Sequence, residues 1–296
     1  MNKNILRLNK KIVAKKFFKE NKLKLFSFLN SNLYFDNISS QKFPSRNGLI
    51  FIEKKNFDIK NKKENIFKSC LIVTNDLLLK KKYKKNIIFS KTPRQLFLRI
   101  LKILKKKNFF KYKNNFNEKY KKSGVFILEN VSIGKNCKIG KNVYLSNCEI
   151  GNNVSIGPNT TIGYEGVTIY KKNKKNYKFP NFGKVIIEDN VSIGSNCSVM
   201  RGTLNNTILF KNVIMSNLIN IGHSVHIGNS SVISSGVQII GGAQIGSNCL
   251  VGSRSAINAN IKIGNNSYIG LGSVVTKNVD KNCKVFGNPA KKISKL

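Results

Sequence analysis

The chain has 296 residues, which is enough for one large domain or two ordinary ones. Its 53 Lys and Arg residues against 13 Asp and Glu give a formal net charge of +40. Nearly all of the excess is Lys, and no recognised DNA- or RNA-binding motif accompanies it, so the composition favours a generally basic surface over nucleic-acid recognition. Such a surface attracts acidic partners without specificity. No apolar run approaches the roughly 20 residues that a membrane-spanning helix requires.

The first 30 residues are basic with interspersed Phe and Leu, and they lack the apolar core and the cleavage site of a secretory signal. An ordinary packed helix is expected there, with peripheral proximity to a membrane as the alternative. The six Cys form no C-x-x-C pair and have no His-rich neighbourhood. We therefore expect reduced thiols in a cytoplasmic protein, and no metal site.

Residues 1–110 contain short apolar segments followed by a helical pattern. Gly48–Ile52 and Cys70–Val73 are expected to be buried strands. The helix that follows them has Pro93 in its first position, where a missing backbone N–H costs nothing. This order predicts a small α/β domain over residues 1–110. Residues 111–124 are polar and rich in Lys, and they are expected to form a linker.

Residues 125–296 follow a period of six. Counting in sixes from Leu209 to Val275 reaches an aliphatic residue or Met at every step, and Gly often comes next. This period fits neither a helix nor a flat strand, and it is typical of a hexapeptide-repeat parallel β-helix, in which three hexads close one coil. The aliphatic residues are expected to form a buried column inside the coils. The predicted fold class is therefore mainly β, with a small N-terminal α/β domain.

The repeat is interrupted at residues 164–184, a segment rich in Lys, Tyr and Phe, and it resumes at Ile187. An insertion in a solenoid projects from one face of the molecule. Such insertions often contribute to a binding site, so we expect this one to lie beside the functional residues.

The chain has two His residues, His223 and His226, and neither occupies an inward position of a hexad. His is the natural general base at neutral pH. One coil after His223 comes Gly241, and two coils and one residue after it comes Asn260. One edge of the prism is thus expected to carry a base, a backbone N–H and an amide side chain, an arrangement suited to acyl transfer. His226 is expected to be an ordinary surface residue.

The segment around His223 resembles the active-site coil of the UDP-3-O-acylglucosamine N-acyltransferase family of lipid A biosynthesis. The similar segments in and around that coil are Phe179–Gly194, Met200–Thr207, Asn217–Gly228 and Ser235–Gly242. In the first domain, Phe51 and Phe57 are similar to the pair of aromatic residues that stack on uridine in that family. The resemblance covers most of the chain.

The resemblance implies a left-handed parallel β-helix that forms a homotrimer, with active sites in the grooves between subunits. It implies that His223 is the general base that deprotonates the amine of a UDP-linked glucosamine, and that Gly241 N–H stabilises the oxyanion. The implied substrate-binding residues are Phe51, Phe57, Asn220 and Asn260. The donor would be a hydroxyacyl chain on acyl carrier protein, and no cofactor is expected.

Two alternatives stay open. The ending Gly287–Ala290 is typical of sugar acetyltransferases that use acetyl-CoA, and Asn260 stands where the family has a second active-site His. The first alternative is therefore an acetyl-CoA-dependent sugar O- or N-acetyltransferase of surface-polysaccharide synthesis. The second is a non-catalytic β-helix scaffold that binds acidic partners.

Overall fold

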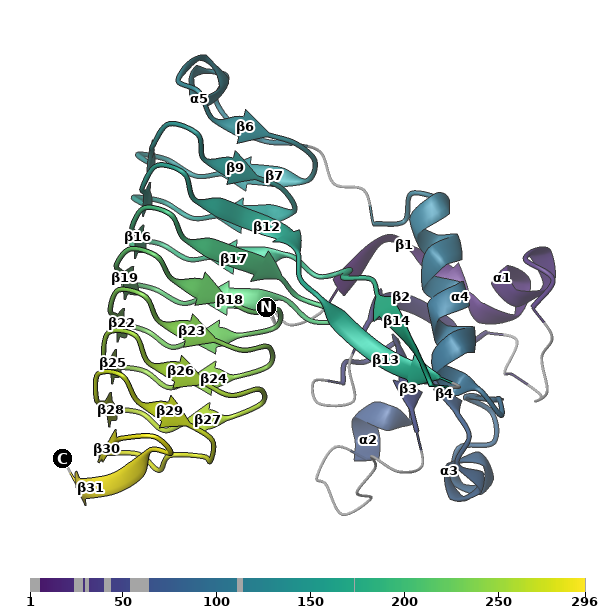
Figure 1. Cartoon of the computed structure of the whole chain (residues 1–296). Coiled ribbons are helices and arrows are strands. Elements are labelled where there is room, and N and C mark those ends of the chain that lie inside the picture. Colours follow the sequence, from purple (N-terminus) through teal and green to yellow (C-terminus); the bar gives the residue numbers. More distant parts are fainter. Residues whose placement is uncertain are drawn as a thin grey trace. The chain divides into compact units, whose positions relative to one another are not determined.

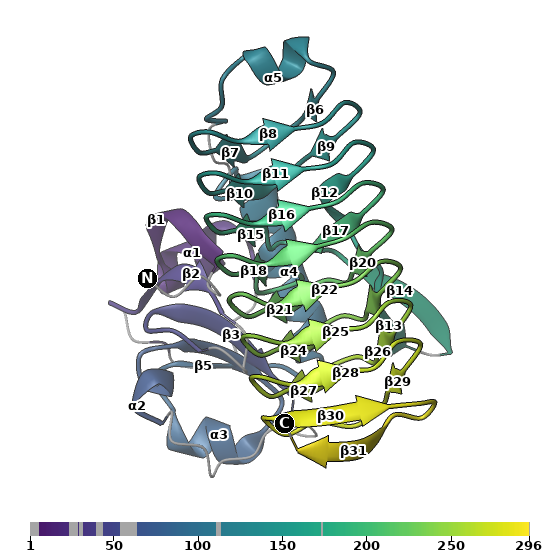
Figure 2. The same cartoon turned by 90° about the vertical axis from the view of Figure 1, so that its left-hand side faces the viewer.

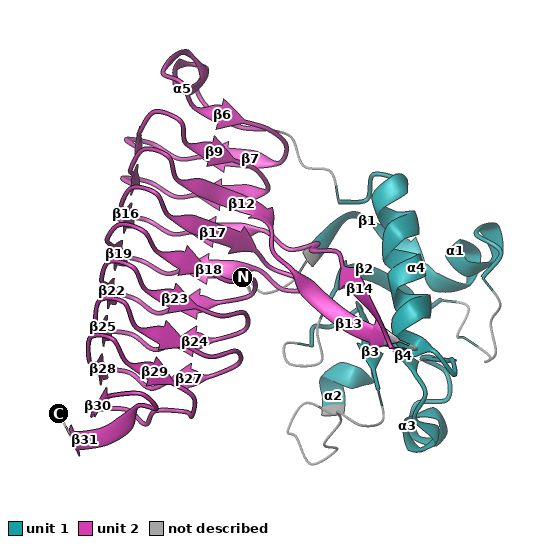
Figure 3. Ribbon diagram, viewed as in Figure 1, with its two compact units in different colours: residues 1–111 teal, residues 112–296 magenta. Residues whose placement is uncertain are grey.

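The computed structural model, drawn from two directions in Figures 1 and 2, describes residues 6–23, 29, 32–39, 44–53, 64–110, 114–172 and 174–295. The chain divides into two compact units, residues 1–111 and residues 112–296 (Figure 3). No helix within the described ranges is long and apolar enough to cross a membrane.

The first unit contains a five-stranded sheet of order β1-β2-β3-β4-β5. Its strands are β1 (Leu6–Val13), β2 (Tyr34–Ile38), β3 (Gly48–Ile52), β4 (Leu71–Thr74) and β5 (Ile87–Phe89). β1 and β2 pair antiparallel, and the other neighbours pair parallel. All four residues of β4 are buried, which is typical of a parallel strand that is covered on both faces.

The helices of the first unit are α1 (Ala14–Glu20), α2 (Glu64–Phe67), α3 (Leu77–Lys82) and α4 (Pro93–Lys106). α4 begins with Pro93, and its buried residues Phe97, Leu101 and Leu104 recur at helical spacing on the side that contacts β3 and β4. α3 is capped by Asp76, whose carboxylate accepts a hydrogen bond of 2.8 Å from Leu78 N–H. The unit is therefore an α/β fold whose sheet packs against α4 and also against a cluster that includes Phe67 of α2 and Leu79 of α3.

The second unit is a left-handed parallel β-helix, in which parallel sheets form the three faces of a triangular prism over residues 114–295 (Figures 1 and 2). Face A consists of β7 (Val131–Ile133), β10 (Cys148–Ile150), β15 (Val185–Ile187), β18 (Thr207–Leu209), β21 (His226–Ile227), β24 (Gln244–Ile245) and β27 (Lys262–Ile263). Face B consists of β8 (Lys138–Ile139), β11 (Ser155–Ile156), β16 (Ser192–Ile193), β19 (Ile214–Met215), β22 (Val232–Ile233), β25 (Leu250–Val251), β28 (Tyr268–Ile269) and β30 (Cys283–Phe286), and β31 (Lys291–Lys295) pairs antiparallel with β30 at its end. Face C consists of β6 (Phe126–Ile127), β9 (Tyr144–Leu145), β12 (Thr161–Glu165), β17 (Ser198–Arg201), β20 (Asn220–Ile221), β23 (Gln238–Ile239), β26 (Ala256–Ile257) and β29 (Val274–Val275).

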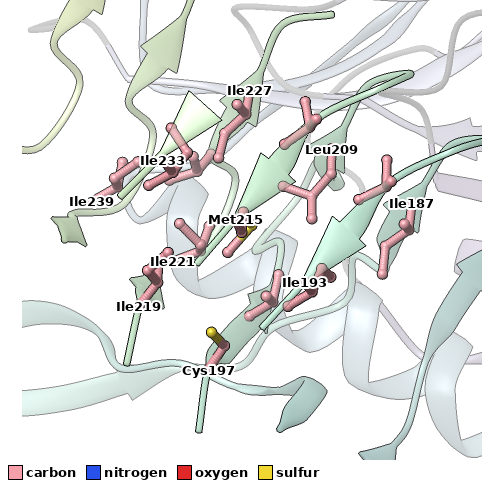
Figure 4. Packing of buried hydrophobic residues seen from close by; sticks show 14 of the residues in the cluster. Ile187, Ile193, Cys197, Leu209, Met215, Ile219, Ile221, Ile227, Ile233 and Ile239 are labelled. Carbon is pink, nitrogen blue, oxygen red and sulfur yellow. The ribbon is translucent and has the colours of Figure 1, made fainter. Parts of the chain in front are cut away.

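The inward residues of the hexads form the buried column that the period of six predicts (Figure 4). Leu209 pairs with Ile227 on the next coil, and Ile227 pairs with Ile245. The exposed fraction of each of these three side chains is 4% or less. Because burying one such side chain contributes about 1.5–3 kcal/mol, stacked coils stabilise a strand that is only two residues long.

Asn residues hold the corners of the prism. Asn136, Asn153, Asn190 and Asn212 adopt positive φ angles between 56° and 62°. Asn tolerates this left-handed backbone better than most residues because its short polar side chain bonds locally. The side-chain amides of the first three each donate to the next Asn along the prism, at 3.2–3.3 Å. The corners are therefore connected by side-chain hydrogen bonds in addition to the backbone ladders.

The segment before the first coil is structured. Residues 119–122 form α5 (Lys119–Lys122), and Tyr120 is buried in the core of the β-helix, with its hydroxyl donating to Cys137 O at 3.2 Å. This part of the expected linker over residues 111–124 therefore covers one end of the prism.

All six Cys are buried free thiols.

The insertion at residues 164–184 forms an antiparallel hairpin of β13 (Thr168–Lys172) and β14 (Lys175–Phe179). Tyr170 and Tyr177 face each other across the hairpin with stacked rings 5.4 Å apart. The hairpin leaves the prism after β12 and returns at β15 (Figure 1). It therefore belongs to the edge that joins face C to face A.

Candidate active site

The same edge of the prism, between face C and face A, carries the polar residues that the sequence singles out. The chain crosses this edge from β17 to β18 through residues 202–206, from β20 to β21 through His223, and from β23 to β24 through Gly241. The hairpin at residues 164–184 crosses it as well. The topology thus gathers segments from successive coils along one line.

The imidazole of His223 is half-buried and is held by a chain of hydroxyl groups. Its Nδ1 lies 3.1 Å from Thr203 Oγ1, which lies 3.1 Å from Thr168 Oγ1 at the start of β13. Desolvation by burial lowers the pKa of His223 below the ordinary value of 6.5. A lowered pKa keeps the ring neutral at neutral pH, and the neutral ring is the form that accepts a proton.

The residue after His223 holds the turn in place. Ser224 has a φ of 60°, and its N–H donates to Thr207 Oγ1 at 2.9 Å. Its own hydroxyl accepts a hydrogen bond of 3.1 Å from Thr203 N–H. The backbones of Thr203 and His223 are therefore fixed against each other from two adjacent coils.

Gly241 lies directly against the ring of His223. A Cβ built on Gly241 would lie 2.5 Å from His223 Nε2 and 2.6 Å from Cε1, closer than real side-chain contacts permit. In the described part of the chain, Gly241 N–H has no hydrogen-bond acceptor. The absence of a side chain thus places the edge of the ring beside an unused backbone donor, which can stabilise a developing oxyanion.

Asn260 lies on the following coil. Its N–H donates to Gly241 O at 3.1 Å, and Gly242 N–H donates to His223 O at 2.9 Å, so three consecutive coils are connected at this edge. The exposed side chain of Asn260 lies over Gly242, where a Cβ would come within 2.5 Å of Asn260 Oδ1. The structure therefore brings His223, Gly241 and Asn260 together.

Asn220 lies on β20, three residues before His223, and its side chain points outward from face C between Ser198 and Gln238. The side chain is half-buried, and its Oδ1 is buried without a hydrogen-bond partner among the described residues. An unsatisfied buried acceptor is costly, so this oxygen is suited to a ligand that donates a hydrogen bond. No direct contact joins it to His223 within the described ranges.

The prediction that His226 is an ordinary surface residue is wrong. The exposed fraction of His226 is 9%, and its ring packs edge-on against Phe210, with ring centroids 6.4 Å apart. It occupies an outward position of face A, but the neighbouring outward residue Ile208 is also buried, at 0% exposure. The sequence period identifies outward positions but does not show which of them other parts of the chain cover.

Sequence reasoning missed the charged cluster at the base of the hairpin. Glu165 and Arg201 are paired residues of β12 and β17, and their side chains form an ion pair, which Lys178 on β14 extends at 3.3 Å. Burial raises the pKa of Glu165, but the hydrogen bonds and charges of Arg201 and Lys178 outweigh it and leave that pKa below the ordinary value. Asn181 donates to Arg201 O at 2.9 Å. The cluster attaches both ends of the hairpin to the prism.

The predicted uridine-stacking residues lie in the first unit. Phe51 on β3 is half-buried, and its ring lies 5.0 Å from the ring of Phe97 on α4. The guanidinium of Arg94 lies 5.9 Å from the centroid of Phe51, and it also pairs with Glu53 at 2.7 Å. Phe57 lies outside the described residues. Phe51 is thus packed on α4 and in contact with a cation.

The polar groups around His223, Gly241 and Asn260 are an imidazole, hydroxyls, an amide and backbone N–H groups. Among the described residues, no group of three or more His, Cys, Asp or Glu is arranged to hold a metal ion. The arrangement can accept a proton at His223 and can donate hydrogen bonds at Gly241 and Asn260. Proton transfer combined with oxyanion stabilisation is the chemistry of acyl transfer.

Comparisons with known protein families match the repeats. The model of the bacterial transferase hexapeptide (six repeats) matches residues 123–164 and 242–277, and the hexapeptide repeat of succinyl-transferase matches residues 184–204. A UDP-3-O-acylglucosamine N-acyltransferase of Acinetobacter baumannii is 44% identical over 62 residues, 21% of this chain and 17% of that protein. One of Lawsonia intracellularis is 50% identical over 46 residues, 16% of this chain and 14% of that protein. These matches span less than a fifth of the length of either relative.

A solved structure with a similar backbone is that of a UDP-N-acetylglucosamine acyltransferase. It superposes with a TM-score of 0.51 at 24% identity, over 61% of this chain and 69% of that chain. At this level of identity the likeness concerns the fold, and it agrees with the left-handed β-helix of the second unit.

Proposed function

We propose that this chain, which contains hexapeptide repeats of the bacterial transferase type, is an N-acyltransferase. The acyl donor is a hydroxyacyl thioester on acyl carrier protein, and the acceptor is the amine of a UDP-3-O-acylglucosamine-like sugar. The observation that carries the proposal is the contact between the ring of His223 and the bare backbone of Gly241. A general base beside an unused N–H is what attack of an amine on a thioester requires.

In the proposed reaction the amine nitrogen attacks the thioester carbonyl carbon while His223 Nε2 takes a proton from that nitrogen. Gly241 N–H donates to the carbonyl oxygen as it becomes negatively charged, and Asn260 adds a second donor from the next coil. The C–N bond forms, the C–S bond breaks, and the departing thiolate takes the proton from His223. The products are an amide and a free thiol, so no cofactor is consumed.

The substrates are inferred from the names of the two relatives, which are both UDP-3-O-acylglucosamine N-acyltransferases and which match this chain over 62 and 46 residues. The outward, unsatisfied Oδ1 of Asn220 supports a polar acceptor such as a sugar. The half-buried Phe51 supports base stacking if the first unit binds uridine, because aromatic rings stack on bases for roughly 1–3 kcal/mol each. The net charge of +40 suits an acidic carrier protein.

A second candidate is transfer of an acetyl group from acetyl-CoA. Its basis is the ending Gly287–Ala290, which pairs with Val274 through hydrogen bonds of 2.9 Å from Val274 N–H to Gly287 O and 2.8 Å from Ala290 N–H to Val274 O. These bonds attach the ending to the last coil, several coils away from His223, so a structural role accounts for it. The carrier-protein donor is therefore the favoured one.

Donor profiling of the purified protein tests the proposal. The acceptor is UDP-3-O-acylglucosamine, and the donors are hydroxyacyl thioesters on acyl carrier protein and, separately, acetyl-CoA. Mass spectrometry is expected to find a fatty amide on the sugar with the carrier-protein donor. A product that carries acetyl alone would favour the second candidate, and no product with any donor would favour a non-catalytic scaffold.

A further inference from the structure

The hydroxyl of Thr203 contacts His223, and the hydroxyl of Thr168 contacts that of Thr203. The proposed chemistry does not by itself require these two contacts. Thr203 comes from the segment between β17 and β18, whereas Thr168 comes from the inserted hairpin. Both oxygens lie at hydrogen-bond distance in series with His223 Nδ1, each step being 3.1 Å. The insertion thus reaches the candidate site through one hydroxyl group.

We propose that Thr203, supported by Thr168, is a positioning residue that holds His223 in the tautomer with its proton on Nδ1. In this arrangement Nδ1–H donates to Thr203 Oγ1, and the hydroxyl hydrogen of Thr203 is directed to Thr168 Oγ1. Nε2 then keeps its lone pair on the side of the ring that lies against Gly241. This inference rests on the proposed function for its purpose, but the tautomer is a property of the free protein.

The surroundings of Thr203 show why its hydroxyl can serve this role. Its backbone N–H donates to Ser224 Oγ, and Ser224 N–H donates to Thr207 Oγ1, so the segment that carries Thr203 is bound at two points to the coil that carries His223. Its side-chain oxygen therefore approaches Nδ1 with little conformational freedom left to lose. A hydroxyl has one hydrogen to donate, and Thr168 supplies an acceptor for it.

The partner of His223 is thus a neutral hydroxyl group, whereas a catalytic His is often oriented by a carboxylate. A hydroxyl sets the tautomer without adding a negative charge next to the ring. The nearest carboxylate of the hairpin base, Glu165, is paired with Arg201 and Lys178. The proposed reaction therefore uses a base that is oriented by its partner but is not made more basic by it.

Nitrogen NMR of the ring tests the proposal directly, because the chain has only two His residues. The protein is labelled with ¹⁵N-His, and the His226→Gln variant assigns the two rings. We expect the wild-type ring of His223 to show a protonated Nδ1 and an unprotonated Nε2 at neutral pH. A wild-type ring with its proton on Nε2 would overturn the proposal.

Substitutions at Thr203 and a matched control complete the experiment. Thr203→Val removes the hydroxyl at constant volume and is expected to give mixed tautomers, with kcat lowered about tenfold and KM little changed. Thr203→Ser should restore both the tautomer and the rate. Thr161→Val, which removes a hydroxyl from β12 of the same prism, should change neither. If the His223 ring of the Thr203→Val variant has the same tautomer as in the wild type, the proposal is contradicted.

If Thr203→Val does not fold, Thr168→Val provides the same test, since it removes only the outer hydroxyl. It is expected to shift the tautomer balance in the same direction by a smaller amount, and an unchanged ring would count against the proposed chain of hydroxyls. Because the spectrum requires no substrate, the two proposals fail separately. If the His223 ring shows the expected tautomer but the protein transfers no acyl group in the assay, the result contradicts the proposed function and supports the positioning role.

Discussion

His223 combines a buried ring with an uncharged hydrogen-bond partner. Desolvation lowers its pKa, and the group at Nδ1 is the hydroxyl of Thr203. Such an imidazole is a weaker base than one paired with a carboxylate, but it stays unprotonated to a lower pH. An amine nucleophile attacks only when a base can take its proton, so the neutral ring is the working form.

The pH dependence of the reaction follows from this pKa. The fraction of neutral His223 falls as the pH decreases through a pKa that lies below 6.5. We therefore expect kcat/KM to decline on the acidic side with a midpoint below 6.5, measured over a pH series with a saturating thioester donor. Because the substrate amine also titrates, the ¹⁵N NMR titration of the His223 ring in the free protein is the deciding measurement, and a ring midpoint above 6.5 would contradict the lowered pKa.

Replacement of the base should remove most of the activity. We expect His223→Ala to lower kcat by about 10²- to 10⁴-fold, the usual contribution of a general base, while the melting temperature changes little. The control is His226→Ala. Because His226 is buried against Phe210, this change should lower the melting temperature, and the remaining folded protein should keep its activity. Equal losses of kcat in the two variants would contradict the assignment.

The contact at Gly241 gives a separate prediction. Gly241→Ala adds a methyl group 2.5 Å from His223 Nε2, so the ring must move away from the backbone N–H. The φ of Gly241 is not positive, so Ala is compatible with the backbone there, and we expect a folded protein with kcat lowered about tenfold or more.

The matched control for this change is Gly272→Ala. Gly272 has a φ of 65° and open space around it, so Ala there should cost stability, roughly 1–2 kcal/mol, without a loss of kcat. Activity assays and thermal unfolding of both variants separate the two effects. Full activity in Gly241→Ala would show that the Gly241 contact does not matter for catalysis.

The sequence predicts some contacts of the site and not others, for a physical reason. His223 and Gly241 are 18 residues apart, one full coil, and parallel pairing places residues at this separation side by side. The series of contacts from His223 to Thr203 and from Thr203 to Thr168 involves residues 202–206 and the insertion at residues 164–184, where the spacing between coils is no longer 18. Its geometry depends on the folded hairpin, which the period does not describe.

At the scale of elements, the hairpin β13–β14 depends on the ion pair at its base. Arg201 has an exposed fraction of 7%, and its Nε is buried without a hydrogen-bond partner among the described residues. Glu165 is half-buried and is held by Arg201 and Lys178. Removing Arg201 would leave the half-buried carboxylate of Glu165 with only Lys178 as its counter-charge, and a partly compensated buried charge is destabilising.

We expect Arg201→Met to lower the free energy of unfolding by about 1–3 kcal/mol, less than for a fully buried pair because Glu165 keeps contact with solvent. The pKa of Glu165 is depressed in the folded protein, so its contribution is present above the unfolded value near 4.5 and is lost as the pH falls through the folded pKa. Denaturant unfolding at several pH values should therefore show a difference between the two proteins that shrinks at low pH. A difference that is constant down to the lowest pH would exclude this ion pair as its cause.

At the scale of the whole molecule, the second unit carries an apolar stripe on face B. Ile214, Val232, Leu250 and Tyr268 are the outward residues of β19, β22, β25 and β28, and they pair in succession along the prism (Figure 2). The exposed fraction is 51% for Ile214 and 39% for Leu250. A contiguous apolar row on a flat sheet is the kind of surface that an assembly buries.

A homotrimer built through the prism is the predicted assembly, because three flat-faced prisms pack about a threefold axis and the stripe on face B is an apolar surface for such packing. Light scattering of the purified protein should give a mass close to three times 33.3 kDa. The double change Ile214→Lys and Leu250→Lys adds charge to the stripe and should shift the mass toward the monomer at low concentration, because unpaired charges are costly to bury. The control Lys138→Ala, at an outward position of β8 near the far end of the same face, should leave the mass unchanged. A wild-type protein that is monomeric at all concentrations would exclude the trimer, and a stable trimer that tolerates the two Lys residues would place the interface on another face.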